Sequence, residues 1–399
     1  MIWLARGFVS LACVLVPFQS VHGQTDYRSF TVQFENDSKG HSDSSYTNGV
    51  RLSWTLLRYR PGMSLFTSYG FPSLLRLVRA DRVGLIPDQL ERQECQPNED
   101  RNNRRKGACY ALNLGIGQNM YTPDSLAGTS LQPFSHPYAG FLFVNFGATT
   151  IDAPYKHGHP AFAFTQFSNQ VILGVTGQAA HAEDTQSLAH WVASTDSHRP
   201  LGWRNQLRQA VQIGLQTDIA YRPRGWEVCA AACDGLVEDG RIFDVTPHTE
   251  LVAGTFMVRA TEGVTARLGY GFPDVLTNQR IPVSLPQRAS DAKGGGGICD
   301  YWGYVFVNVD GRYVPYNMFV EGGLADGGPS GWRTLRQIDP RRLLAEGAIG
   351  LVAGNSRFSF VGQFARRTNE FDVRGLPHTV HPQGYLSLAL TIQPPRYFR

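Results

Sequence analysis

The chain has 399 residues, enough for two ordinary domains or for one large barrel, and its formal net charge is only +4. The short run Arg101–Lys106 stands beside acidic residues, so no basic block indicates a nucleic-acid partner. With 42 Gly, 16 Tyr and 23 Phe residues, the composition favours a β-rich protein over a helical one.

Residues 1–23 have the pattern of a secretory signal peptide. Arg6 lies near the start, an apolar stretch runs from Phe8 to Phe18, and small and polar residues precede an expected cleavage near Gly23. A membrane anchor is the alternative, but this stretch is shorter than the roughly 20 apolar residues that span a bilayer. We therefore expect export and a mature domain over residues 24–399, without an apolar run long enough for a transmembrane helix.

The mature chain alternates apolar residues with small or polar ones, as Phe30, Val32 and Phe34 show. Segments of about ten residues with this period are typical of strands in membrane-spanning β-barrels. A soluble β-sandwich also alternates, so the number of such segments after a signal peptide favours the barrel. We predict an all-β fold, a transmembrane antiparallel β-barrel of about 12 strands in the bacterial outer membrane. The predicted strands lie near 28–37, 46–57, 108–120, 138–150, 161–175, 208–222, 243–256, 261–271, 301–319, 344–354, 356–368 and 382–393.

An even number of strands places both termini on the periplasmic side, so connections after odd-numbered strands face outward. The connections 58–107 and 272–300 are then long for periplasmic turns. Either they are insertions on that side or the strand parity is shifted. We treat 58–107 as an insertion in the barrel domain.

Cys13 leaves with the signal peptide, so five of the six cysteines remain in the mature chain, and export would bring them to an oxidising compartment. We expect one disulfide between Cys95 and Cys109 and another between Cys229 and Cys233. Cys299 then has no partner for a disulfide. A zinc site is the alternative, but no histidine lies at ligand spacing from these cysteines.

One segment departs from the strand pattern. Residues 179–192 lack Gly and Pro and are rich in helix formers, with Leu188 and Val192 four positions apart. We predict a short helix there, in the extracellular loop after the fifth strand.

Oxygen-bearing side chains gather where the first two predicted strands meet. Asn36 and Asp37 end the first strand, and Thr47 and Asn48 begin the second. Amide, carboxylate and hydroxyl oxygens suit a hard cation such as calcium. The alternative is ordinary turn chemistry, in which Asn, Asp and Ser are standard residues.

Four further residues lie on the same predicted rim. His190 lies in the helical loop and is a candidate general base, with Gln186 one turn earlier on the same helix face. Tyr121 and His136 lie in the connection between the third and fourth strands. A surface histidine and interfacial tyrosines are the alternative interpretation.

Taken in their order along the chain, these sequence motifs resemble those of the lipid A 3'-O-deacylase family of outer-membrane barrels, the LpxR-like proteins. Each motif is weakly specific, but the ordered series covers nearly the whole mature chain. The matching segments are Glu35–Asp37, Tyr46–Gly49, Leu52–Trp54, Tyr121–Pro123, Pro137–Gly140, Leu173–Val175, Gly177, Gln186, His190, Gly202–Trp203, Asn205–Leu207, Phe243–Asp244, Pro247–His248, Thr368 and Glu370–Phe371.

The resemblance implies a twelve-stranded barrel that removes the 3'-linked acyloxyacyl chain of lipid A in a calcium-dependent hydrolysis. Carried over residue by residue, His190 would be the catalytic base. Asn36, Asp37 and Thr47 would form the catalytic and cation-linked part of the site. The residues expected to contact substrate are Gln186, Tyr121 and His136.

Relatives carry a lysine in the loop after the third strand, whereas residues 124–137 contain no Lys or Arg. His136 stands where many relatives have arginine. His136, calcium alone or a backbone donor would then hold the oxyanion. Asp196 is a candidate for the role of a glutamate that follows the catalytic histidine in relatives.

The expected partners are lipopolysaccharide and the lipids of the outer membrane, and we expect a monomer, because a closed barrel has no free edge. Two other functions stay open. One is a phospholipid-type acyl hydrolase that uses the same base and cation. The other is a catalytically inactive structural barrel.

Overall fold

The computed structural model describes residues 27–37, 45–57, 109–152, 162–193, 200–223, 225–229, 241–270, 301–328, 331–355, 357–375 and 382–392. The predicted signal peptide, the 58–107 and 272–300 connections and Asp196 lie outside these residues. So do Cys95, Cys233, Cys299 and the side chains of Cys109 and Cys229, so both disulfides stay predictions.

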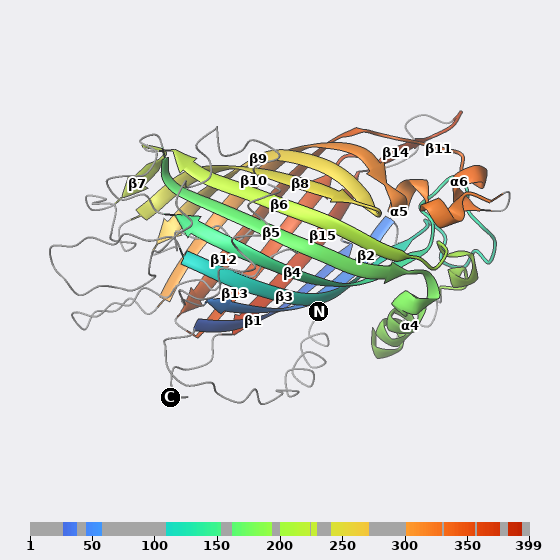
Figure 1. The fold of residues 1–399 in the computed structure, drawn as a ribbon, viewed down its shortest axis with the longest axis horizontal. Coiled ribbons are helices and arrows are strands. Elements are labelled where there is room, and N and C mark those ends of the chain that lie inside the picture. Colours follow the sequence, from blue (N-terminus) through green and yellow to red (C-terminus); the bar gives the residue numbers. More distant parts are fainter. Residues whose placement is uncertain are drawn as a thin grey trace.

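Twelve long strands form one closed antiparallel barrel, which confirms the predicted fold (Figure 1). Each barrel strand pairs with the next barrel strand along the chain, including β6 with β8, and the pairing of β15 with β1 closes the wall. The barrel strands are β1 (Tyr27–Asp37), β2 (Ser45–Leu57), β3 (Cys109–Thr122), β4 (Ala139–Asp152), β5 (Phe162–Thr176), β6 (Val211–Pro223), β8 (Arg241–Gly254), β9 (Met257–Tyr270), β10 (Tyr301–Asn317), β12 (Leu343–Asn355), β13 (Phe358–Arg367) and β15 (Gln383–Ile392).

The strands form as the alternation predicts, with boundaries that differ by a few residues from the expected ones. The largest shift is at β9, which begins at Met257 rather than near residue 261. β10 ends at Asn317, where the Asn317 side chain accepts a hydrogen bond from the backbone N–H of Phe319 and caps a helix.

The short elements gather at one end of the barrel, on the right of Figure 1. They follow β5, β10 and β13, which are odd-numbered among the barrel strands, so this is the end predicted to be extracellular. Within the ranges described, no helix has both the length and the apolar character needed to cross a membrane. These elements are η2 (Gly177–Ala180), α4 (Ala182–Ala193), η4 (Trp203–Asn205), α5 (Met318–Glu321), η6 (Leu324–Asp326), α6 (Trp332–Leu335) and the paired strands β11 (Ile338–Pro340) and β14 (Phe371–Val373).

The helix predicted within 179–192 is confirmed as α4, which begins three residues later. At the opposite end, the short strand β7 (Glu227–Cys229) pairs with β8.

The two faces of the wall differ in chemistry. On β3 the outward residues Leu114 and Ile116 are exposed, whereas the inward Asn113 is buried and accepts a hydrogen bond from Thr55. An exposed apolar face suits lipid, and buried polar groups stay favourable only when they are hydrogen-bonded.

A chain of ionisable side chains, most of them buried, crosses the inside of the barrel. Each neighbouring pair joins an acidic group to an arginine or a histidine, with distances of 2.8–3.4 Å between the interacting atoms. The members, in order of contact, are His136, Glu370, Arg367, Glu346, Arg312, Asp310 and His248. We call this set the charge chain. It ties β8, β10, β12 and β13 to the connections at the extracellular end.

Candidate active site

The helix α4 lies against the outer face of the barrel wall. Gln118 on β3 donates a hydrogen bond from Nε2 to the carbonyl oxygen of Ala180, at 2.5 Å. On β4, a Cβ added to Gly140 would lie 2.6 Å from the Cβ of Ala182. The absence of a side chain at residue 140 therefore lets α4 approach the wall closely.

Two buried side chains fix α4 beside the wall. Trp203 in η4 is fully buried and donates a hydrogen bond from Nε1 to Oε1 of Gln186, at 2.8 Å. Tyr138 packs on the Trp203 ring at 4.9 Å between centroids and donates its hydroxyl to the carbonyl of Leu126. Gln186 thus has a structural partner in addition to the substrate role predicted for it.

His190 lies one turn after Gln186 in α4, so its backbone is on the helix face that carries Gln186. Its side chain is outside the described residues. The structure therefore positions the backbone of the predicted base beside the outer wall, and the catalytic role stays a prediction.

A row of paired residues connects Asn36 to α4 across the wall. The strand registers pair Asn36 with Asn48, Asn48 with Met120, and Met120 with Gly140. Three strand spacings of about 4.8 Å separate Asn36 from Gly140, roughly 14 Å in all. Asn36 is on the outer-face side of β1, because it follows Phe34 by two positions.

Asn48 has a buried polar atom without a hydrogen-bond partner in the described part of the chain. Its Oδ1 atom is buried, and no described residue donates a hydrogen bond to it. A buried acceptor without a donor is costly unless water or a ligand satisfies it. Because the amide oxygens of Asn48 and Asn36 belong to neighbouring paired residues, this donor set fits a hard cation such as calcium.

The other two predicted cation ligands lie close by in the chain. Asp37 ends β1 and pairs in register with Tyr385 of β15, and by the same alternation it is on the opposite side of β1 from Asn36. Thr47 is at an irregularity in the register between Tyr46 and Asn48. The Thr47 side chain is outside the described residues. Among the described residues, no group of three or more His, Cys, Asp or Glu side chains could hold a metal.

Tyr121 and His136 are on the inner side of the wall, away from α4. The Tyr121 ring stacks on Phe319 at 4.3 Å between centroids. His136 is buried, with Nδ1 3.2 Å from the Phe319 carbonyl oxygen and Nε2 3.4 Å from Glu370. The structure therefore does not bring these two predicted substrate contacts together with α4.

Glu370 has a lowered pKa in this buried setting. Burial alone would raise the pKa of its carboxyl group, but the charge of Arg367 and the hydrogen bond from His136 lower it well below its ordinary value. Glu370 is therefore ionised, and it holds His136 inside the barrel.

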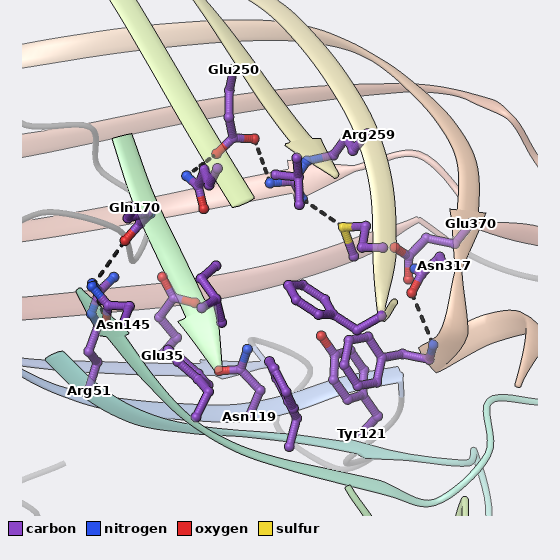
Figure 2. Close-up of a pocket in the computed structure, with 18 of the residues that line it drawn as sticks. Glu35, Arg51, Asn119, Tyr121, Asn145, Gln170, Glu250, Arg259, Asn317 and Glu370 are labelled. Carbon is purple, nitrogen blue, oxygen red and sulfur yellow. Dashed lines mark hydrogen bonds and ion pairs between the residues drawn. The ribbon is translucent and has the colours of Figure 1, made fainter. Parts of the chain in front are cut away.

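A cavity of about 150 Å³ lies inside the barrel, beside Tyr121, and Figure 2 shows the residues that line it. One part of its lining is aromatic, including Phe141 and Phe319. The other part is charged and paired, as in the ion pair between Arg259 and Glu250 at 2.5 Å. The pairing is incomplete, because the buried atoms Arg51 Nε, Asn119 Oδ1 and Arg259 Nε have no hydrogen-bond partner among the described residues.

A valine at residue 140 tests how tightly α4 is packed on the wall. We expect Gly140→Val to displace α4 and to lower the free energy of unfolding by about 1–3 kcal/mol, the usual cost of overpacking. Urea unfolding and limited proteolysis of the loop 177–210 would measure both effects.

Gly311→Val is the matched control, because an added Cβ there meets only one atom, at 3.9 Å. Equal protease resistance of the two variants would contradict close packing at Gly140.

Comparisons with known proteins agree with this architecture. The family model described as "Outer membrane protein LpxR" matches residues 8–391. None of the curated proteins matches the chain in sequence. The structure of LpxR from Salmonella typhimurium is similar, with a TM-score of 0.57 and 14% sequence identity, over 91% of this chain and 99% of that one.

Other barrels are more distant. An outer membrane channel from Pseudomonas putida F1 gives a TM-score of 0.36 at 7% identity, over 95% of this chain and 99% of that one. The β domain of the Bordetella autotransporter BrkA gives a TM-score of 0.35 at 6% identity, over 92% of this chain and 98% of that one.

The fold, the closed wall and the match over nearly the whole chain place the protein in the outer membrane. The chain belongs to the family of the outer membrane protein LpxR.

Proposed function

We propose that this barrel is an outer-membrane esterase that removes the 3'-linked acyloxyacyl chain from lipid A. Family membership supports the activity, and the position of α4 is the observation that carries the proposal. The helix that contains His190 lies on the lipid-facing side of the wall, near the extracellular rim. A lipid of the outer leaflet can reach this position without leaving the membrane.

In this mechanism His190 acts on water. The imidazole takes a proton from a water molecule, and the resulting hydroxide attacks the carbonyl carbon of the ester. As the tetrahedral intermediate collapses, the protonated His190 returns the proton to the leaving alkoxide oxygen. The carboxylic acid and the deacylated lipid are the products, and no serine or cysteine nucleophile is required.

Asn36, Asp37 and Thr47 would hold a calcium ion with their side-chain oxygens. When bound, calcium would supply Lewis-acid stabilisation of the oxyanion. The unsatisfied Oδ1 of Asn48 supports a fourth ligand at this place. Six to eight oxygen ligands are usual for calcium, so water and the substrate would complete the shell.

The missing lysine of the 124–137 loop does not require His136 as a substitute. His136 contacts Glu370 and the Phe319 carbonyl inside the barrel, away from α4. We therefore propose that the oxyanion would be stabilised by calcium, when it is bound, or by a backbone donor.

Mass spectrometry of lipid A from cells that express the chain tests the proposal. We expect a loss of mass equal to the 3'-linked acyloxyacyl group. Unchanged lipid A with release of phospholipid acyl chains would instead support the phospholipid hydrolase. If neither lipid changes in the presence of calcium, the barrel is structural.

Removal of calcium should suppress the reaction. With purified protein and lipid A in detergent, we expect EGTA to lower the rate by about 10²-fold or more, as for the loss of an oxyanion donor. Added Ca²⁺ should restore the rate, and Mg²⁺ should not, because Mg²⁺ demands a stricter octahedral shell. A rate that is unchanged by EGTA would remove calcium from the mechanism.

A further inference from the structure

The side of α4 that faces away from the wall carries two exposed apolar residues. Leu188 is 59% exposed and Trp191 is 74% exposed. Successive helical residues are 100° apart, so Leu188 lies about 200° and Trp191 about 140° from Gln186 around the axis. The side chain of Gln186 is buried beside the wall at 2% exposure. The apolar pair therefore points away from the barrel.

The wall beneath α4 presents an apolar surface to lipid. Val144 on β4 is 45% exposed, and Leu173 on the neighbouring β5 is 47% exposed. Val144 is four residues beyond Gly140, which contacts α4, so it lies roughly 13 Å further along the strand. Both residues are on the outward side of the wall, because they alternate with buried inward residues. α4 is thus at the upper edge of the lipid-facing surface.

We propose that α4 is seated in the outer leaflet of the membrane, with Leu188 and Trp191 inserted among the lipids. The occupant of this apolar face is a lipid surface, because the face continues the lipid-facing side of a barrel that belongs to an outer-membrane family. Tryptophan is enriched at the membrane interface, where its ring is apolar and its N–H is polar. Amphipathic helices lie in the interface with their apolar side in the lipid.

The first turn of α4 fits the same position. Glu183 and Asp184 are exposed there, and Asp184 pairs with His181 at 2.9 Å. Glu183 and Asp184 would stay among the lipid headgroups. Leu188 and Trp191, about one to two turns later, would reach the acyl chains. Lipid on one side and the wall on the other would then hold α4 in place, independently of any catalysis.

Tryptophan fluorescence of the full chain in phosphatidylcholine vesicles tests this proposal. The chain has 7 Trp residues, so Trp191 is isolated as the difference between the wild type and Trp191→Phe. We expect this difference to be blue-shifted, strongly quenched by lipids with brominated acyl chains, and little quenched by aqueous iodide. Heat-modifiable migration in gels confirms that each variant is folded.

Trp54→Phe and Trp332→Phe provide the references. Trp54 is on the outer side of β2 and is 40% exposed, whereas Trp332 in α6 is 4% exposed. The Trp54 difference should be quenched by brominated lipid, and the Trp332 difference by neither agent. Leu188→Trp in the Trp191→Phe background is a second probe on the same face.

A difference signal for Trp191 with water-like emission and strong iodide quenching would overturn the proposal. So would protection of Trp191 from both agents, because that result would place a second copy of the chain on this face. Neither measurement depends on ester hydrolysis, so a failure here is distinguishable from a failure of the proposed activity.

Discussion

Replacing His190 by alanine is expected to lower ester hydrolysis by about 10²–10⁴-fold, the usual contribution of a general base. In the proposed mechanism, only His190 activates the attacking water, so its loss leaves binding and calcium chemistry but removes proton transfer. The fold should be retained, because residues on α4 outside the barrel do not contribute to its closure. Initial rates on lipid A in detergent micelles, followed by mass spectrometry, measure the effect.

His181→Asn is the matched control for this prediction. His181 is in the same loop, is exposed, and adopts a left-handed backbone with φ of 52°, which asparagine tolerates. We expect this variant to keep its rate within a few-fold of the wild type. If His190→Ala kept its rate while His181→Asn lost activity, the base would have to be reassigned.

Replacing Glu346 by alanine is expected to destabilise the barrel by about 3–5 kcal/mol, because it removes the central acid of the charge chain. Glu346 is buried on β12 and pairs with Arg312 at 2.8 Å and with Arg367 at 2.9 Å. It also accepts a hydrogen bond from the Tyr385 hydroxyl at 2.7 Å. The substitution would leave two buried guanidinium groups without this carboxylate. Urea unfolding of the refolded protein in detergent measures the loss.

Asp339→Ala is the control for the Glu346 prediction. Asp339 pairs with Arg374 at 2.8 Å, but both side chains are more than half exposed. An exposed pair of this kind contributes about 0–1 kcal/mol, since solvent screens it. Glu346→Gln keeps an acceptor for the Tyr385 hydroxyl. Its loss of unfolding free energy should therefore lie between those of Glu346→Ala and Asp339→Ala. Similar losses of unfolding free energy for Glu346→Ala and Asp339→Ala would show that burial does not determine how much the charge chain contributes to stability.

The sequence by itself determined the barrel and its strands. Alternation with a period of two is a local signal, because successive side chains of a strand point to opposite faces. It can be detected in each segment without knowledge of the neighbours. The short helix was predictable for a similar reason, since residues 182–193 lack Gly and Pro. The family could be recognised because its motifs keep their order along the chain.

The side of the wall on which each candidate residue lies was decided only by the tertiary structure. Tyr121 and His136 occur in the same connection as residues near α4, yet their side chains pack inside the barrel against Phe319 and Glu370. Phe319 and Glu370 come from distant parts of the chain, so no local sequence pattern predicts their contacts with Tyr121 and His136. A rim predicted from strand ends alone does not distinguish inside from outside, because both faces meet there.

The position of α4 on the outer wall could also be assigned only from the three-dimensional fold. It depends on the register that aligns Asn36, Asn48, Met120 and Gly140, and on the contact between Gly140 and Ala182. Strand register is set by pairing between strands and by irregularities such as the one beside Thr47, which shift every later partner. The sequence thus determined which elements exist, and packing between distant elements decided which candidate residues share a face.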